Sequence, residues 1–158
     1  MRAPVPSGFV RDYSRIVLGC GNGAFDAARE AMRNWTEFDL GWVQVANPSA
    51  PVADGQVVAV IAHTAELWTV NLSRIVKTVD APRQFGFLYA TTPMHVERGE
   101  ERFLIERDEA GGEVRYTIEA VSRPRALLAR LGYPFTRAMQ RRFARESLAR
   151  MAAAVQRI

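Results

Sequence analysis

The sequence predicts an α+β fold in which a curved antiparallel sheet of six or seven strands packs around one long C-terminal helix. Strand-like segments follow one another at hairpin spacing between residues 40 and 121. The chain then ends in a helical stretch with a large, mostly apolar stripe, which needs a broad surface to cover. No regular alternation of strands and helices, as in a parallel sheet, is present. A closed β-barrel with an appended helix is the main alternative.

The length and composition favour one soluble domain. The 158 residues, 48% of them hydrophobic, fit a single domain over 1–158, with 1–12 as a loose N-terminal arm. Cys20 is the only cysteine, so we expect no disulfide framework, no thiolate metal site and a reducing cytoplasmic location. The first residues lack the apolar core of a signal peptide, and no apolar run is long enough to span a membrane.

The N-terminal elements are a short strand and an amphipathic helix. Residues 13–18 read as the strand, and residues 23–35 as the helix that closes one end of the sheet. Asn22 is the expected N-cap. The predicted buried side of the helix consists of Phe25, Ala28, Met32 and Trp35.

The predicted sheet continues through six further segments: 40–45, 56–63, 67–79, 84–91, 100–107 and 113–121. The last of them alternates apolar and polar residues, so one of its faces is buried and the other is wet. The final helix, 134–156, begins at Pro134, which suits a first helical position. Its apolar stripe contains Phe135, Met139, Phe143, Ser147, Met151, Val155 and Ile158.

A glycine-rich turn at residues 19–23 follows a strand and opens a helix, as a dinucleotide-binding loop does. However, the glycine spacing misses the fingerprint because position 24 is Ala, and Asp39 precedes a strand instead of ending one. We therefore interpret the segment as a strand-to-helix turn and expect no cofactor.

Residues 91–103 hold His95, one of only two histidines, among several carboxylates and arginines. A histidine beside a carboxylate can act as an acid or base near neutral pH. The competing interpretation is a polar turn held by salt bridges. Alternation places Glu101 inward and Glu100 outward, and Arg74 is the expected partner of Glu101. No third ligand accompanies His95 and Glu97, so we expect no metal site.

These patterns predict a cavity between the sheet and the last helix, lined by a strand wall and a helix wall, that binds a hydrophobic small molecule without catalysis. The candidate ligand-binding residues are Arg74, Phe87, Tyr89, His95, Glu101, Tyr116, Phe135 and Met139. A filled core without a cavity is the competing interpretation.

Two other functions stay open at this point. The first is a small-molecule enzyme that uses His95, Glu101 and Tyr89 at the cavity rim. The second is an interaction module that uses Arg137, Arg141 and Arg145, which recur on one helix face, to contact an anionic membrane surface. Nucleic acid is a disfavoured partner, because basic and aromatic residues are not interleaved. The sequence indicates no oligomeric state.

Several short strings resemble one family over nearly the whole chain, from Tyr13 to Val155. They include Gly99-Glu100-Glu101-Arg102-Phe103, Ser122-Arg123-Pro124 and Gly132-Tyr133-Pro134. The family is DUF1990, a domain of unknown function, whose pattern is similar to helix-grip proteins of the START and birch-pollen-allergen type. The resemblance implies that fold and, by analogy, binding of hydrophobic small molecules. One departure is Tyr89-Ala90-Thr91-Thr92, where family members often carry Tyr-Gly-Thr-Leu.

Overall fold

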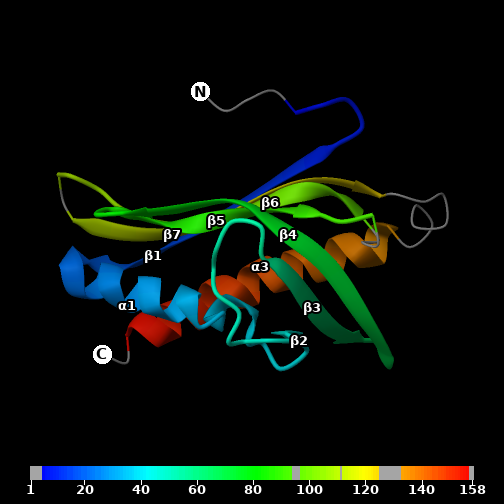
Figure 1. The fold of residues 1–158 in the computed structure, drawn as a ribbon, viewed down its shortest axis with the longest axis horizontal. Helices are drawn as coiled ribbons and strands as arrows, with labels where there is room; N and C mark the ends of the chain where they lie inside the picture. Colours follow the sequence, from blue (N-terminus) through cyan, green and yellow to red (C-terminus); the bar gives the residue numbers. More distant parts are fainter. Residues whose placement is uncertain (1–4, 94–96, 111, 125–132, 157–158) are drawn as a thin grey trace.

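An antiparallel sheet of seven strands curls over the two long helices in this computed structural model, and both helices lie on the same side of the sheet (Figure 1). The structure describes residues 5–93, 97–110, 112–124 and 133–156. The elements in chain order are β1 (Val10–Cys20), α1 (Gly21–Arg33), the short helix η1 (Thr36–Phe38), β2 (Val43–Val45), β3 (Val57–Thr64), β4 (Leu67–Ala81), β5 (Gln84–Thr91), β6 (Glu97–Arg107), β7 (Glu113–Pro124) and α3 (Tyr133–Val155).

The strand order is β1-β7-β6-β5-β4-β3-β2, and every neighbouring pair is antiparallel. The two edge strands, β1 and β2, do not pair with each other within the described ranges. The sheet is therefore a curved half-barrel, which confirms the predicted α+β architecture over the closed barrel. Its antiparallel pairing also removes the parallel sheet that a dinucleotide loop would require.

The turn at residues 19–23 is a structural connection. Gly21 has φ 80°, a left-handed conformation that favours glycine, and its N–H donates to the carbonyl of Gly112 at 2.7 Å. That amide is therefore used to join β1 and α1 to the β6–β7 turn. The expected N-cap at Asn22 is wrong, because α1 already begins at Gly21 and Cys20 caps it without a side-chain hydrogen bond.

Two element boundaries also differ from the prediction. The loose arm expected over 1–12 is too long, because β1 begins at Val10 and pairs with β7 from there. Trp35 is buried as predicted but lies beyond α1, in a left-handed conformation with φ 56°. Its indole N–H donates to the carbonyl of Ala50 at 2.8 Å, so it connects the end of α1 to the loop before β3.

The core fills one part of the space between the sheet and the helices. Phe87 stacks on Phe103 at 5.0 Å between ring centroids, and Trp35 meets Phe87 edge-on at 5.3 Å. Tyr116 and Ser147 are both fully buried, and their hydroxyl oxygens are 3.1 Å apart, so one hydrogen-bonds to the other. The polar position in the apolar stripe of α3 is therefore satisfied by the sheet.

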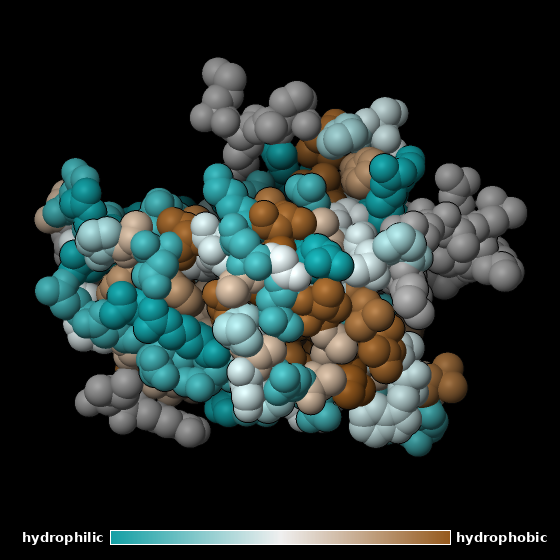
Figure 2. Space-filling view, in the orientation of Figure 1, coloured by the Kyte–Doolittle hydropathy of each residue, from teal (hydrophilic) through white to brown (hydrophobic). Residues whose placement is uncertain are grey.

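The outer face of β4 is more apolar than that of a typical solvated strand. Trp68 and Val70 are 67% and 58% exposed, and His63 of β3 stacks on Trp68 at 4.4 Å. Figure 2 shows hydrophobic residues among the polar ones on the part of the surface where β3 and β4 lie. Alternation along β4 places Arg74 on this outer face, whereas Ser73 and Ile75 face inward and are buried.

Candidate functional site

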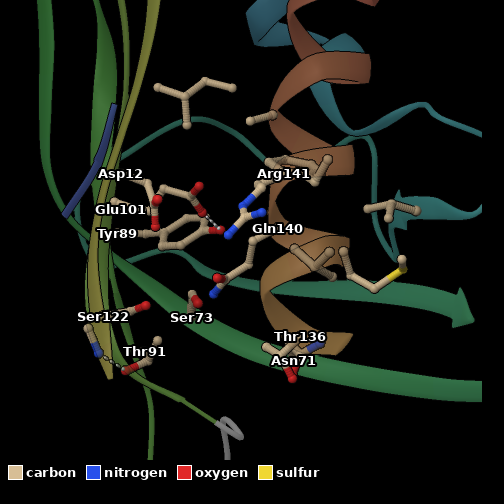
Figure 3. Close-up of a pocket in the computed structure, with 18 of the residues that line it drawn as sticks. Asp12, Asn71, Ser73, Tyr89, Thr91, Glu101, Ser122, Thr136, Gln140 and Arg141 are labelled. Carbon is tan, nitrogen blue, oxygen red and sulfur yellow. Dashed lines mark hydrogen bonds between the residues drawn. The ribbon is translucent and has the colours of Figure 1, made fainter. Parts of the chain in front are cut away.

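A cavity of about 290 Å³ lies between the inner face of the sheet and the N-terminal half of α3 (Figure 3). Its volume is near the lower end of the range of roughly 300–1,000 Å³ that is usual for small-molecule sites. Apolar side chains form much of the lining: Phe38, Trp42, Val43, Val60, Ile118, Ala120, Met139, Phe143 and Ala144. Polar side chains gather at one side of it: Asp12, Asn71, Ser73, Tyr89, Thr91, Glu101, Ser122, Thr136, Gln140 and Arg141.

The register of the sheet explains why polar groups from distant segments meet in the cavity. Glu101 of β6 lies opposite Tyr89 of β5 and opposite Ala120 of β7. Ala120 in turn lies opposite Asp12 of β1. Directly opposed residues of antiparallel strands share a face, so all of these side chains belong to the inner face. The inward orientation predicted for Glu101 agrees with this register.

Tyr89 and Glu101 form a hydrogen-bonded pair in the wall of the cavity. The Tyr89 hydroxyl donates to a carboxylate oxygen of Glu101 at 2.7 Å. Desolvation by burial, followed by the negative charge of Glu101, raises the pKa of Tyr89 well above its usual value. The phenol therefore stays protonated near neutral pH, where it serves as a hydrogen-bond donor and not as a base.

The first turns of α3 bring two arginines to the same region in different roles. Arg137 pairs with Asp12 of β1 through both of its terminal nitrogens, one of them 2.6 Å from Asp12 Oδ1, and it also donates to Gln140 Oε1 at 2.8 Å. Arg141 lines the cavity and points toward Tyr89 and Glu101 in Figure 3. It forms no ion pair with any residue that the structure describes.

Asn71 of β4 supplies a second polar group that has no partner among the described residues. Its Oδ1 atom is buried and accepts no hydrogen bond from any described residue, and the side chain lines the cavity. A buried acceptor that loses water without gaining a donor costs about 1–3 kcal/mol. The cavity therefore contains an acceptor that a bound molecule can satisfy.

The structure brings together only part of the residue set expected from the sequence. Tyr89, Glu101 and Met139 line the cavity. Phe87 and Tyr116 face inward as expected, but they are buried in the adjacent packed core and do not line the cavity. Their rings fill the space beside it.

Two other candidates lie elsewhere, and one lies outside the described residues. Phe135 is 50% exposed and does not line the cavity, because it precedes the part of α3 that faces the sheet. Arg74 is exposed on the outer face, where its Nη1 donates to the carbonyl of Gly55 at 3.2 Å. Its expected pairing with Glu101 is wrong, because the two side chains lie on opposite faces of the sheet. His95 lies outside the described residues.

Sequence reasoning missed several cavity residues, most clearly Asn71 and Arg141. Asn71 carried a usable signal, since alternation along the strand puts its side chain on the face opposite to that of Trp68 and Arg74. Arg141 looked like one member of a solvated arginine face, with Arg137 and Arg145. Only the docking of α3 separates their roles: Arg137 is 14% exposed beside Asp12, whereas Arg145 is 73% exposed.

A curved antiparallel sheet that grips a long C-terminal helix defines the helix-grip class of proteins, and comparison with known proteins gives the family. The family described as "Domain of unknown function (DUF1990)" matches residues 1–150. A UPF0548 protein of Dictyostelium discoideum is 37% identical over 163 aligned residues, which cover 96% of this chain and 76% of that protein. The chain belongs to the DUF1990 family.

Solved structures of low sequence similarity share the fold. The hypothetical protein jhp0584 from Helicobacter pylori aligns with a TM-score of 0.62 at 10% identity, over 97% of this chain and 94% of that one. The di-domain ARO/CYC StfQ from the steffimycin biosynthetic pathway aligns with a TM-score of 0.60 at 12% identity, over 94% of this chain and 51% of that one. Within the described ranges, no helix is long and apolar enough to cross a membrane.

Proposed function

We propose that this protein binds a hydrophobic small molecule in the cavity between the inner face of the sheet and α3. The observation that carries the proposal is the cavity itself, a mostly apolar space with polar groups at one side, next to a core that is otherwise closely packed. The fold that this chain shares with StfQ, a protein of a biosynthetic pathway, agrees with the handling of small molecules. At 12% identity the likeness concerns the fold, so the proposal rests on the cavity.

Catalysis on a bound carbonyl or ester is the enzymatic alternative. It needs a group that takes a proton near neutral pH, and the raised pKa of Tyr89 removes the phenol from that role. His95, a second group in that hypothesis, lies outside the described residues. Binding is therefore the function that the described geometry supports best. The cytoplasmic location expected from the single cysteine stays a prediction.

The structure weakens the hypothesis that the arginines of α3 form an interaction module for anionic surfaces. Of the three arginines that were expected to form one basic face, Arg137 is occupied by Asp12 and Arg141 lines the cavity. Arg141 and Arg145 are both exposed, as an anionic surface would need, and Arg145 is 73% exposed. We expect attraction to anionic vesicles to be weak and to disappear at physiological salt.

Two alanine-to-leucine variants, one that fills the cavity and one control, test the proposed binding. Ala144 lines the cavity from α3, whereas Ala149 lies on the exposed side of the same helix. The neutral, environment-sensitive dye prodan should bind the unmodified protein with a blue-shifted emission. We expect Ala144→Leu to weaken the dye about tenfold or more, because the larger side chain occupies the space, and Ala149→Leu to leave it unchanged.

Thermal unfolding of both variants controls for general damage to the fold. Native mass spectrometry of the protein purified from its own cells adds a second test, because a retained apolar molecule would identify the natural ligand. If prodan fails to bind and the protein shows only the mass of the free chain, the proposed function is wrong.

A further inference from the structure

The hairpin made by the end of β3 and the start of β4 carries the most exposed large apolar side chains among the described residues. Leu67 and Trp68 are each 67% exposed, and Val70 is 58% exposed. All three lie within four consecutive positions of β4, so they form one cluster. Apolar side chains that gather on a surface mark a place where another molecule is bound.

The end of this hairpin is apolar on both of its faces. Trp68 and Val70 belong to the outer face, where His63 lies opposite Trp68, whereas Leu67 belongs to the inner face with Asn71. Leu67 is exposed in spite of this inward orientation. The helices therefore do not cover the inner face at the end of the hairpin, which projects away from them (Figure 1).

The end of the hairpin is also narrow and almost free of charge. Thr64 and Leu67 pair directly, and the two residues between them, Ala65 and Glu66, both have positive φ, as in the tight two-residue turns of hairpins. Glu66 is the only residue with a formal charge among residues 61–70. A protein partner with one flat surface would cover one face of such a hairpin and leave the other exposed, whereas lipid can surround both faces.

The cavity extends to this end of the molecule. Asn71, further along β4 from Leu67, lines it, and so does Thr136 in the first turn of α3. Phe135, next to Thr136, adds a side chain that is 50% exposed. A hairpin held at a bilayer would therefore keep this end of the cavity close to the phase in which hydrophobic molecules concentrate.

We propose that the β3–β4 hairpin docks this protein on a phospholipid bilayer, with Leu67, Trp68 and Val70 inserted into the membrane interface. Tryptophan favours that region because its ring is apolar and its indole N–H stays hydrated. The contact is apolar and needs no anionic lipid, in contrast to the electrostatic attraction expected of the arginines on α3. It rests on the hairpin and does not require that the cavity holds a ligand.

Flotation of the full chain with vesicles of neutral phosphatidylcholine tests the lipid contact. We expect the protein to float with the vesicles at physiological salt and to stay bound at about 0.5 M salt, because salt screens charges and not apolar burial. Trp68→Ala and Leu67→Ala should each weaken the partition into the vesicles about tenfold, because each removes apolar area that the lipid would bury.

Val17→Ala is the matched control. Val17 is 50% exposed but lies on β1, away from the hairpin, so this variant should partition like the unmodified protein. Thermal unfolding of the three variants checks that the fold is retained, as we expect for side chains that are at least half exposed.

Four results would overturn the lipid contact. The first is no binding to the neutral vesicles. The second is binding that requires anionic lipid and falls with salt, which would assign the contact to the arginines of α3. The third is a loss in Trp68→Ala without a loss in Leu67→Ala, which would indicate a partner on the outer face alone. The fourth is a dimer in analytical ultracentrifugation that Trp68→Ala converts into a monomer, which would make the hairpin a contact between two copies of the chain.

Prodan binding in the absence of vesicles separates this inference from the proposed function. Trp68 does not line the cavity, whereas Ala144 does. Trp68→Ala should therefore lose vesicle binding and keep prodan, and Ala144→Leu should lose prodan and keep vesicle binding. If vesicles bind and prodan does not, the lipid contact stands and the proposed cavity function fails; the reverse result removes the lipid contact alone.

Discussion

Glu37 is a carboxylic acid enclosed in the core. Its side chain is fully buried on η1, and neither oxygen accepts a hydrogen bond from a residue that the structure describes. Its charge would act on the buried hydroxyls of Tyr116 and Tyr89. Desolvation raises the pKa of Glu37 to about 8, against a smaller opposing effect of its own backbone amide. Glu37 is therefore mostly protonated at neutral pH.

This proton makes the stability of the protein depend on pH. The folded pKa of about 8 exceeds the ordinary value of 4.5, so the stability associated with the protonated form is fully present below about pH 4.5 and is lost as the pH rises through about 8. The shift corresponds to a loss on the order of 5 kcal/mol in the free energy of unfolding. Urea unfolding at several pH values between about 5 and 9 measures this decline.

Glu37→Gln should remove most of that decline, because an amide does not ionise in this range. Glu30→Gln is the control, since Glu30 is exposed on α1 and should leave the pH profile unchanged. A pH profile of Glu37→Gln that still falls as steeply as that of the unmodified protein would contradict the assignment of the decline to Glu37.

Among the elements, β5 and β6 approach each other so closely that a side chain is excluded at Gly86. A Cβ atom built there would lie 2.1 Å from the backbone oxygen of Phe103. Gly86→Ala should therefore force the two strands apart and lower the free energy of unfolding by about 1–3 kcal/mol, as overpacking does. Gly23→Ala is the control variant, because a Cβ atom at that position would have no described atom within 4 Å. Alanine favours a helix more than glycine does, so this substitution should raise the free energy of unfolding by roughly 0.5–1 kcal/mol. Thermal unfolding compares the two variants, and equal effects would refute the close approach.

The connection between α3 and the edge strand β1 depends on the pair of Arg137 and Asp12. Arg137 is only 14% exposed, and two parallel hydrogen bonds hold its guanidinium. Arg137→Met should lower the free energy of unfolding by about 1–3 kcal/mol. Arg83→Met removes a surface pair with Glu109, whose side chains are 48% and 76% exposed, and should cost about 0–1 kcal/mol. Urea unfolding measures the free energy of unfolding of both variants. An equal loss in the two would show that the pair of Arg137 and Asp12 does not anchor α3.

At the scale of the whole molecule, local periodicity was enough to predict the architecture. The alternation in 113–121 gave the inner face of β7, although Thr117 on the face expected to be wet is buried, and the strand over 84–91 was predicted with the bounds of β5. Both signals depend on neighbouring residues in one chain segment, where the period of a strand or helix decides which side chains are buried. The same reasoning placed Tyr89 and Glu101 on the inner face.

The remaining site residues depended on contacts between segments far apart in the sequence. Arg74 was the expected partner of Glu101, but in the structure it shares the outer face of β4 with the exposed Trp68 and Val70. The prediction of Asn22 as the N-cap was wrong for a related reason. The N–H of Gly21 donates to a carbonyl of the β6–β7 turn, which is distant in the sequence, and α1 begins there. Local patterns do not record such partners.

The sequence by itself determined that an antiparallel sheet curls around a long helix, and which face of most strands is buried, because hydrophobic periodicity is a local property. Only the tertiary structure decided where the core ends and the cavity begins. The curvature of the sheet and the docking of α3 through Arg137 and Asp12 bring Arg141 toward Tyr89 and Glu101, whereas Asn71 lies apart from them, near Thr136 (Figure 3). Packing between distant segments sets that geometry.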